Sequence, residues 1–143
     1  MFGVKYVRLM GLDIGDKTIG VSVSDELNWM AHGICTIKRK SIDFDINQLD
    51  RIIKEKQISK IIIGLPKNMN NTIGSSGNRS IEFGEALKNR YPDIEIVFWD
   101  ERLTTVAAEK ILIEADVSRK NRKKVIDKIA ATFILQNYID AQN

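Results

Sequence analysis

The hydrophobic pattern along the chain predicts three consecutive β-strands within the first 40 residues. The stretch "YVRLMGLDI" (6–14) is mostly apolar, and "TIGVSVSD" (18–25) alternates apolar side chains with small or polar ones. That alternation has the period of a half-buried strand. A third strand is predicted for "GICTIKR" (33–39). Because the connections are too short to hold a crossover helix, we expect an antiparallel meander.

Beyond residue 43 the pattern predicts helices that alternate with strands. Apolar residues recur at helical spacing in "DFDINQLDRIIKEKQI" (43–58), and a short buried strand, "KIIIGLP" (60–66), follows. The remaining predicted elements are a helix at 75–91, a strand at 94–101, a helix at 104–117 and a last helix at about 123–140. The order βββαβαβαα predicts an α/β fold. Its five-stranded mixed sheet should be antiparallel on one side and parallel on the other, with helices on both faces.

Composition narrows the class of protein without giving an activity. The chain has 143 residues, the size of one domain, so we expect a single domain over 1–143. With 43% hydrophobic and 29% charged residues it is typical of a globular protein. It has neither an apolar run that could cross a bilayer nor a signal peptide, which predicts a cytoplasmic protein without membrane contact. The lone Cys35 excludes an internal disulfide framework and a cysteine-based zinc site, and it fits a reducing compartment.

Asp13 is in an unusual place, at the end of the first apolar run and between two glycines, Gly11 and Gly15. Aspartate is a poor strand residue, and it costs free energy to bury as an ion unless a counter-charge is near. Two interpretations are open. Asp13 caps the turn at Gly15, or it faces a cation at the carboxyl end of the strand, where α/β sheets place their sites.

Asp127 falls on the predicted buried face of the last helix. The positions that share this face are Asp127, Ala131, Ile134, Leu135 and Tyr138. An unpaired buried carboxylate costs several kcal/mol, roughly, unless it is neutralised or meets a cation. Either something positive lies beside Asp127, or the aspartate lies just past the apolar stripe, on the surface.

A further pair of acids, Asp100 and Glu101, ends the fifth predicted strand, and strand alternation sends the two to opposite faces. Alternation alone does not choose between them. One aspartate from the first strand, one acid from this strand end and Asp127 form an all-oxygen donor set, which suits Mg²⁺ or Mn²⁺. Two such ions can hold and hydrolyse a phosphodiester. The pattern therefore predicts nuclease chemistry.

Four stretches resemble the YqgF/RuvX family of bacterial pre-16S rRNA nucleases: "GLDIGDKTIGVSVSD", "IIIGLPKN", "DERLTTVAAEKIL" and "RKNRKKVIDKIAATFILQNYI". The resemblance covers nearly the whole chain. It implies a ribonuclease H-like fold, shared with the Holliday junction resolvases. It also implies that Asp13, Glu101 and Asp127 are the catalytic and metal-binding acids. The choice of Glu101 over Asp100 rests on this resemblance.

The function implied is two-metal hydrolysis of phosphodiester bonds in the 5′-end maturation of pre-16S rRNA, by a monomer or weak homodimer. The partner would be RNA (pre-rRNA) or another structured nucleic acid, and the precursor of the small ribosomal subunit is a further candidate. One alternative is a Holliday junction resolvase acting on branched DNA, and another is a non-catalytic nucleic-acid-binding factor in ribosome assembly. The sequence departs from many family members at Thr18, where arginine is common, and at Ser22, where alanine is frequent.

The stretch "SRKNRKKVIDK" (118–128) holds six Lys or Arg residues and one acid. It is either a solvated start of a helix or a surface that holds phosphates beside the acids. The nucleic-acid-binding residues that we predict are Lys17, Arg102, Arg119, Lys120, Arg122, Lys123 and Lys124. "KRK" (38–40) either extends this surface or is an exposed hairpin end. The polar "NMNNTIGSSGNRS" (68–80) is either a substrate loop or an ordinary connection.

Overall fold

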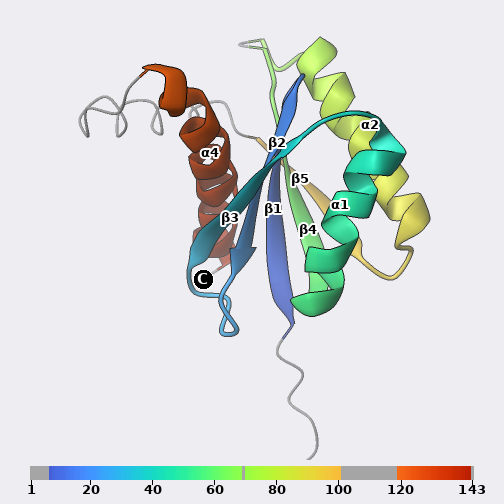
Figure 1. Cartoon of the computed structure of the whole chain (residues 1–143), viewed down its shortest axis with the longest axis vertical. Coiled ribbons are helices and arrows are strands. Elements are labelled where there is room, and N and C mark those ends of the chain that lie inside the picture. Colours follow the sequence, from blue (N-terminus) through green and yellow to red (C-terminus); the bar gives the residue numbers. More distant parts are fainter. Residues whose placement is uncertain (1–6, 69, 101–118, 143) are drawn as a thin grey trace, which may run out of the picture.

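Five strands form one sheet in the order β3-β2-β1-β4-β5, and helices cover both of its faces (Figure 1). The computed structural model describes residues 7–68, 70–100 and 119–142, and for 119–127 it describes the helical backbone alone. The strands are β1 (Arg8–Ile14), β2 (Thr18–Ser24), β3 (Ala31–Lys38), β4 (Ile58–Leu65) and β5 (Glu95–Asp100). The helices of these ranges are α1 (Ile42–Glu55), α2 (Ser75–Arg90) and α4 (Arg119–Gln142).

The strand pairing confirms the predicted mixed sheet. β1 pairs antiparallel with β2, and β2 pairs antiparallel with β3. β4 runs parallel to both of its neighbours, β1 and β5. The carboxyl ends of β1, β4 and β5 consequently lie at one end of the sheet, as in other α/β folds where this end carries the site.

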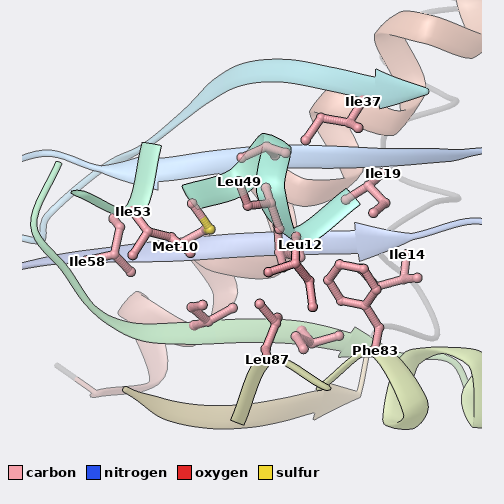
Figure 2. Packing of buried hydrophobic residues seen from close by; sticks show 14 of the residues in the cluster. Met10, Leu12, Ile14, Ile19, Ile37, Leu49, Ile53, Ile58, Phe83 and Leu87 are labelled. Atoms are coloured by element: carbon pink, nitrogen blue, oxygen red, sulfur yellow. The ribbon is translucent and has the colours of Figure 1, made fainter. Parts of the chain in front are cut away.

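Alternation along the strands divides the core between the two faces. One face packs against α1 and α2, and its fully buried side chains include Met10, Leu12, Phe83 and Leu87 (Figure 2). On the other face, α4 packs its own buried stripe against Ile62. That stripe is formed by Ala131, Ile134, Leu135 and Tyr138. These four residues confirm the predicted phase of the last helix.

The end of α1 and the start of β4 differ from the prediction, because a turn that no glycine or proline marks in the sequence separates them. α1 ends at Glu55 and β4 already begins at Ile58, so a helix through residue 58 is wrong. Between them, Gln57 has a φ of 53°, in the left-handed region that stops a helix. Glycine or asparagine commonly marks such a position, whereas glutamine does not.

The outer strand and the last helix are longer than predicted. β3 begins at Ala31, which pairs with Ser24, and not at residue 33. α4 begins at Arg119, not at about 123, so the basic stretch lies within the helix. The helix predicted at 104–117 lies outside the described residues. No helix in the described part of the chain has both the length and the apolar character needed to cross a lipid bilayer.

A side-chain hydrogen bond joins α1 to the residue that follows α2. The Tyr91 hydroxyl donates to the Asp50 carboxylate, and Lys54 Nζ lies 2.9 Å from the other oxygen of that carboxylate. Partial burial of the phenol, together with its bond to Asp50, raises the pKa of Tyr91 to about 12. The two helices are therefore linked through a neutral tyrosine.

This link predicts a loss of stability in strong base. The unfolded chain releases the tyrosine proton near pH 10, whereas the folded chain keeps the proton on Tyr91 up to about pH 12. The contribution is complete below about pH 10 and is lost as the pH rises toward about 12. We expect Tyr91→Phe to flatten this part of the profile in urea unfolding measured across the same range. An unchanged slope in the variant would contradict the assignment.

Candidate functional site

Asp13 lies near the end of β1 with a half-buried side chain. Leu9 packs into the α4-side cluster, and Gly11 lies directly under α4. Because alternate strand residues share a face, Asp13 is on the α4 side of the sheet. The alternating residues Met10 and Leu12 point to the opposite face and pack in the core beneath α1 and α2. The predicted carboxylate is therefore at the carboxyl end of the central strand.

Glycines flank Asp13 on both neighbouring strands. Asp13 pairs with Gly20 of β2, and on β4 Gly64 follows Ile63, the partner of Leu12. Both glycines are buried. The two adjacent strands therefore place neither a bulky apolar side chain nor a charge beside the carboxylate at this level of the sheet.

The backbone of α4 comes level with Asp13 at position 127. α4 runs antiparallel to β1, and its C-terminal end lies where β1 begins (Figure 1). A Cβ on Gly11 would lie 2.8 Å from the Ala131 carbonyl oxygen, so Ala131 of α4 and Gly11 of β1 lie side by side. Asp13 is two strand residues further on, about 7 Å. Residue 127 is one turn before Ala131, about 6 Å along the helix.

Ser22 joins β2 to α4 beside this point. Its side chain is fully buried, and the hydroxyl donates to the Ala131 carbonyl at 2.7 Å. A buried hydroxyl needs such a partner, because an unmade hydrogen bond in the interior is costly. Ser22 therefore adds a direct hydrogen bond between the sheet and the helix that carries Asp127.

The structure places the predicted acids unequally. Asp13 and the helical backbone at Asp127 are brought to the same level of the sheet, whereas Glu101 lies outside the described residues, directly after β5. Among the side chains that the structure describes, no three His, Cys, Asp or Glu residues gather as a metal site. The side chains of Asp127 and Glu101 are not in that set, so the three-acid site stays a prediction.

Alternation along β5 follows the prediction as far as the strand is described. Trp99 packs in the α4-side cluster, where its ring makes an edge contact with Tyr138 at 5.5 Å between centroids. Phe98 lies on the opposite face, where a Cβ on Gly84 of α2 would come within 2.5 Å of its ring. Alternation accordingly assigns the last residue, Asp100, to the α2 face.

The predicted nucleic-acid-binding residues are likewise described only in part. Lys17 is exposed in the turn between β1 and β2, at the carboxyl end of β1. Arg102 lies outside the described residues. The other five, which occupy the first turns of α4 and are described by their backbone alone, are Arg119, Lys120, Arg122, Lys123 and Lys124. The first turn contains no acidic residue.

Both interpretations of "KRK" (38–40) are wrong for its middle residue. Arg39 has a side chain only 15% exposed, and its Nε lies 3.0 Å from Oδ2 of the fully buried Asp45. It is therefore neither part of an exposed hairpin end nor available to a phosphate. Asp45 was not expected in a buried pair, because an acid in the first turn of a helix usually serves the helix dipole in solvent.

The polar stretch 68–80 is divided between a loop and a helix, since residues from Ser75 on belong to α2. The loop and the start of the helix line an open pocket of about 290 Å³ at the carboxyl end of β4. Its lining is Pro66, Lys67, Asn68, Gly74, Ser75, Ser76 and Gly77. The loop thus borders the sheet end that holds Asp13, and its role as a substrate loop stays a prediction.

Known proteins match this chain over almost its full length. The RuvX family model, described as "Holliday junction resolvase", matches residues 7–141. A protein of Staphylococcus haemolyticus is 54% identical over 136 residues, covering 94% of this chain and 96% of that protein. A protein of Clostridioides difficile is 59% identical over 133 residues, covering 93% and 94%. Both carry the name "Putative pre-16S rRNA nuclease".

Solved structures share the fold at low sequence identity. RuvC of T. thermophilus, in complex with a Holliday junction substrate, has a TM-score of 0.58 at 10% identity and covers 95% of both chains. The yeast mitochondrial Holliday junction resolvase has a TM-score of 0.58 at 11% identity, over 96% of this chain and 79% of that one. These likenesses confirm the ribonuclease H-like fold that the sequence predicted.

Proposed function

This chain belongs to the RuvX family, and on that premise we propose that it is a divalent-metal-dependent nuclease that hydrolyses phosphodiester bonds, in the 5′-end maturation of pre-16S rRNA. One observation carries the proposal. Asp13 is a half-buried carboxylate at the carboxyl end of β1, on the face where α4 brings position 127 to the same level. Relatives that are more than half identical and are named for pre-16S rRNA support the substrate class.

The donor set fits Mg²⁺ or Mn²⁺. Asp13, Glu101 and Asp127 offer carboxylate oxygens only, which these hard cations prefer to nitrogen or sulfur ligands. Gly20 and Gly64 leave the flanks of Asp13 without side chains from the adjacent strands. When bound, two such ions supply Lewis-acid activation of the phosphodiester and of the attacking water. In this proposal the three acids hold the ions, and Asp13 contributes from the centre of the sheet.

Cationic side chains would hold the phosphates that flank the scissile bond. The basic residues at 119–124 begin α4, where positive charge opposes the helix dipole by about 0.3 to 1 kcal/mol per charge. That placement does not serve the helix, so it favours a role toward an anionic partner. Lys17, exposed beside the end of β1, and Arg102, which follows Glu101 in the chain, extend the same surface in the proposal.

A cleavage assay tests the proposal. The purified protein is incubated with a 5′-extended 16S precursor RNA and, separately, with a four-way DNA junction, in Mg²⁺, Mn²⁺ or EDTA. We expect cleavage of the RNA with either metal, none in EDTA, and an intact junction. Symmetric cutting of the junction by a dimer would instead favour the resolvase alternative. Binding without any cleavage would favour an assembly factor, and cleavage that persists in EDTA would contradict the metal requirement.

The basic start of α4 predicts a specific salt dependence. Replacing Lys120, Lys123 and Lys124 together with glutamine should weaken RNA binding and flatten its dependence on salt. On duplex, the log–log slope should fall by up to about 0.9 for each phosphate that a lysine no longer neutralises. Fluorescence anisotropy over a series of KCl concentrations measures both the affinity and the slope.

The matched control for this variant removes three lysines elsewhere, Lys54 and Lys56 at the end of α1 and Lys88 near the end of α2. We expect this control to keep the natural slope. If both triple variants behave alike, binding depends on net charge and the proposed surface is wrong.

A further inference from the structure

One arginine holds the turn that follows Asp13. The turn consists of Gly15, Asp16 and Lys17, and it is closed by the Gly15 N–H, which donates to the Thr18 carbonyl at 2.8 Å. Nη1 of Arg39 donates to the Gly15 carbonyl at 2.9 Å, and the backbone N–H of Arg39 donates to the Lys17 carbonyl at 2.9 Å. Both ends of the turn are thus fixed by a single residue.

The guanidinium of Arg39 is itself fixed by Asp45. The Nε donates to Oδ2 of Asp45 at 3.0 Å, and Oδ1 accepts the backbone N–H of Lys40 at 3.0 Å. The Arg39 Cζ lies 5.6 Å from the ring centroid of Phe83, whose ring lies beside Ile14 at the end of β1 (Figure 2). The Arg39 guanidinium therefore contacts the turn from the face of the sheet that α1 and α2 cover, opposite the face that carries Asp13.

Stability alone does not account for this arrangement. The desolvation of two buried charges largely offsets their attraction, and an apolar pair of similar volume is often as stable or more so. An apolar pair cannot hold a backbone carbonyl in one place. The planar guanidinium of arginine donates hydrogen bonds from several nitrogens at once, here from Nε to Asp45 and from Nη1 to Gly15. The ammonium of lysine is a single point charge and does not reproduce this geometry.

We propose that Arg39, fixed by Asp45, is a positioning residue that sets the carboxyl end of β1 and with it the orientation of the Asp13 carboxylate. This role rests on the proposed function and adds to it a residue on the far face of the sheet. Asp13 is two residues before Gly15, whose carbonyl accepts the hydrogen bond from Arg39. A shift of the turn therefore reaches Asp13 through two peptide units of a paired strand.

The test compares two variants with one control. The double variant Arg39→Met, Asp45→Leu removes both charges and leaves no buried ion unpaired, and Arg39→Lys keeps the charge without the planar guanidinium. The control, Tyr91→Phe, removes the hydrogen bond from Tyr91 to Asp50 of α1, away from the turn. Thermal unfolding reports folding. Amide signals and hydrogen exchange report the turn in metal-free protein, and a Mn²⁺ titration and steady-state RNA cleavage report the site.

In both Arg39 variants we expect shifted amide signals from Asp13 to Thr18 and exchange of the Gly15 amide about tenfold faster. Mn²⁺ affinity and kcat should fall roughly 10- to 100-fold, the usual effect of removing a group that orients a metal ligand, while KM changes little. Tyr91→Phe should keep all of these at natural values, whatever its thermal midpoint.

The proposal is overturned if the Arg39 variants fold and keep the wild-type amide signals of the turn, Mn²⁺ affinity and kcat. It is also overturned if Tyr91→Phe lowers Mn²⁺ affinity and kcat to the same extent. If the natural protein neither binds Mn²⁺ nor cleaves RNA, the proposed function fails. The metal-free amide measurements still decide in that case whether Arg39 sets the end of β1.

Discussion

Asparagine in place of Asp13 is expected to lower the rate of RNA hydrolysis by roughly a thousandfold or more, about 4 kcal/mol of transition-state stabilisation. The amide has nearly the size of the carboxylate, and the neighbours on both adjacent strands are glycines, so these two strands need no repacking. The substitution removes the negative charge and one oxygen donor for a divalent cation. Single-turnover cleavage at saturating Mg²⁺ measures the effect, and thermal unfolding confirms that the variant is folded.

Asp16→Asn is the matched control for Asp13→Asn. Asp16 is exposed in the turn three residues further along, and its replacement changes the net charge by the same amount. We expect its cleavage rate to stay within about twofold of the natural rate, since charges on an exposed turn are largely screened. A folded Asp13→Asn protein that cleaves as fast as this control would remove Asp13 from the site.

The second large effect is expected from Gly11→Ala, which should destabilise the fold by about 1 to 2 kcal/mol and reduce cleavage as well. A Cβ at Gly11 would lie 2.4 Å from Ser22 Oγ, 2.7 Å from Leu135 Cβ and 2.8 Å from the Ala131 carbonyl oxygen. Two of these atoms belong to the rigid frame of α4, so the helix must move. Alanine also lowers the backbone entropy of the unfolded chain, but this stabilises the folded protein by only about 0.5 to 1 kcal/mol.

Because α4 carries position 127, the same movement separates that position from Asp13. The free energy of unfolding in urea and the cleavage rate should therefore fall together in Gly11→Ala. Gly33→Ala is the matched control on the outer strand, where the new Cβ would lie 2.6 Å from Cγ of Lys128, in a flexible side chain. We expect a smaller loss of stability there. Equal losses at the two glycines would mean that close approach of α4 to β1 is not the constraint.

Much of the fold was predictable because the buried side chains repeat with the period of their element. The stripe through Ala131, Leu135 and Tyr138 could be counted from the sequence, and all three are buried as counted. Boundaries failed where a backbone angle decided the outcome. Gln57 takes a left-handed conformation between α1 and β4, and nothing in the identity of a glutamine announces it.

The candidate site was predictable where a residue is out of place for its element. Asp13 is such a residue, since an aspartate that ends an apolar strand requires a reason. Arg39 and Asp45 were missed because each looks ordinary in sequence, one within a run of basic residues and the other in the first turn of a helix. Only the fold shows that they meet in the interior, 3.0 Å apart.

Anomalous diffraction from crystals soaked in Mn²⁺ tests most directly the central claim, that Asp13, Glu101 and Asp127 share divalent cations. We predict anomalous peaks at ligand distance from the Asp13 carboxylate, with carboxylate oxygens of Glu101 and Asp127 around the same peaks. Mn²⁺ that binds elsewhere, or a peak at Asp13 that neither of the other two acids approaches, would contradict the claim.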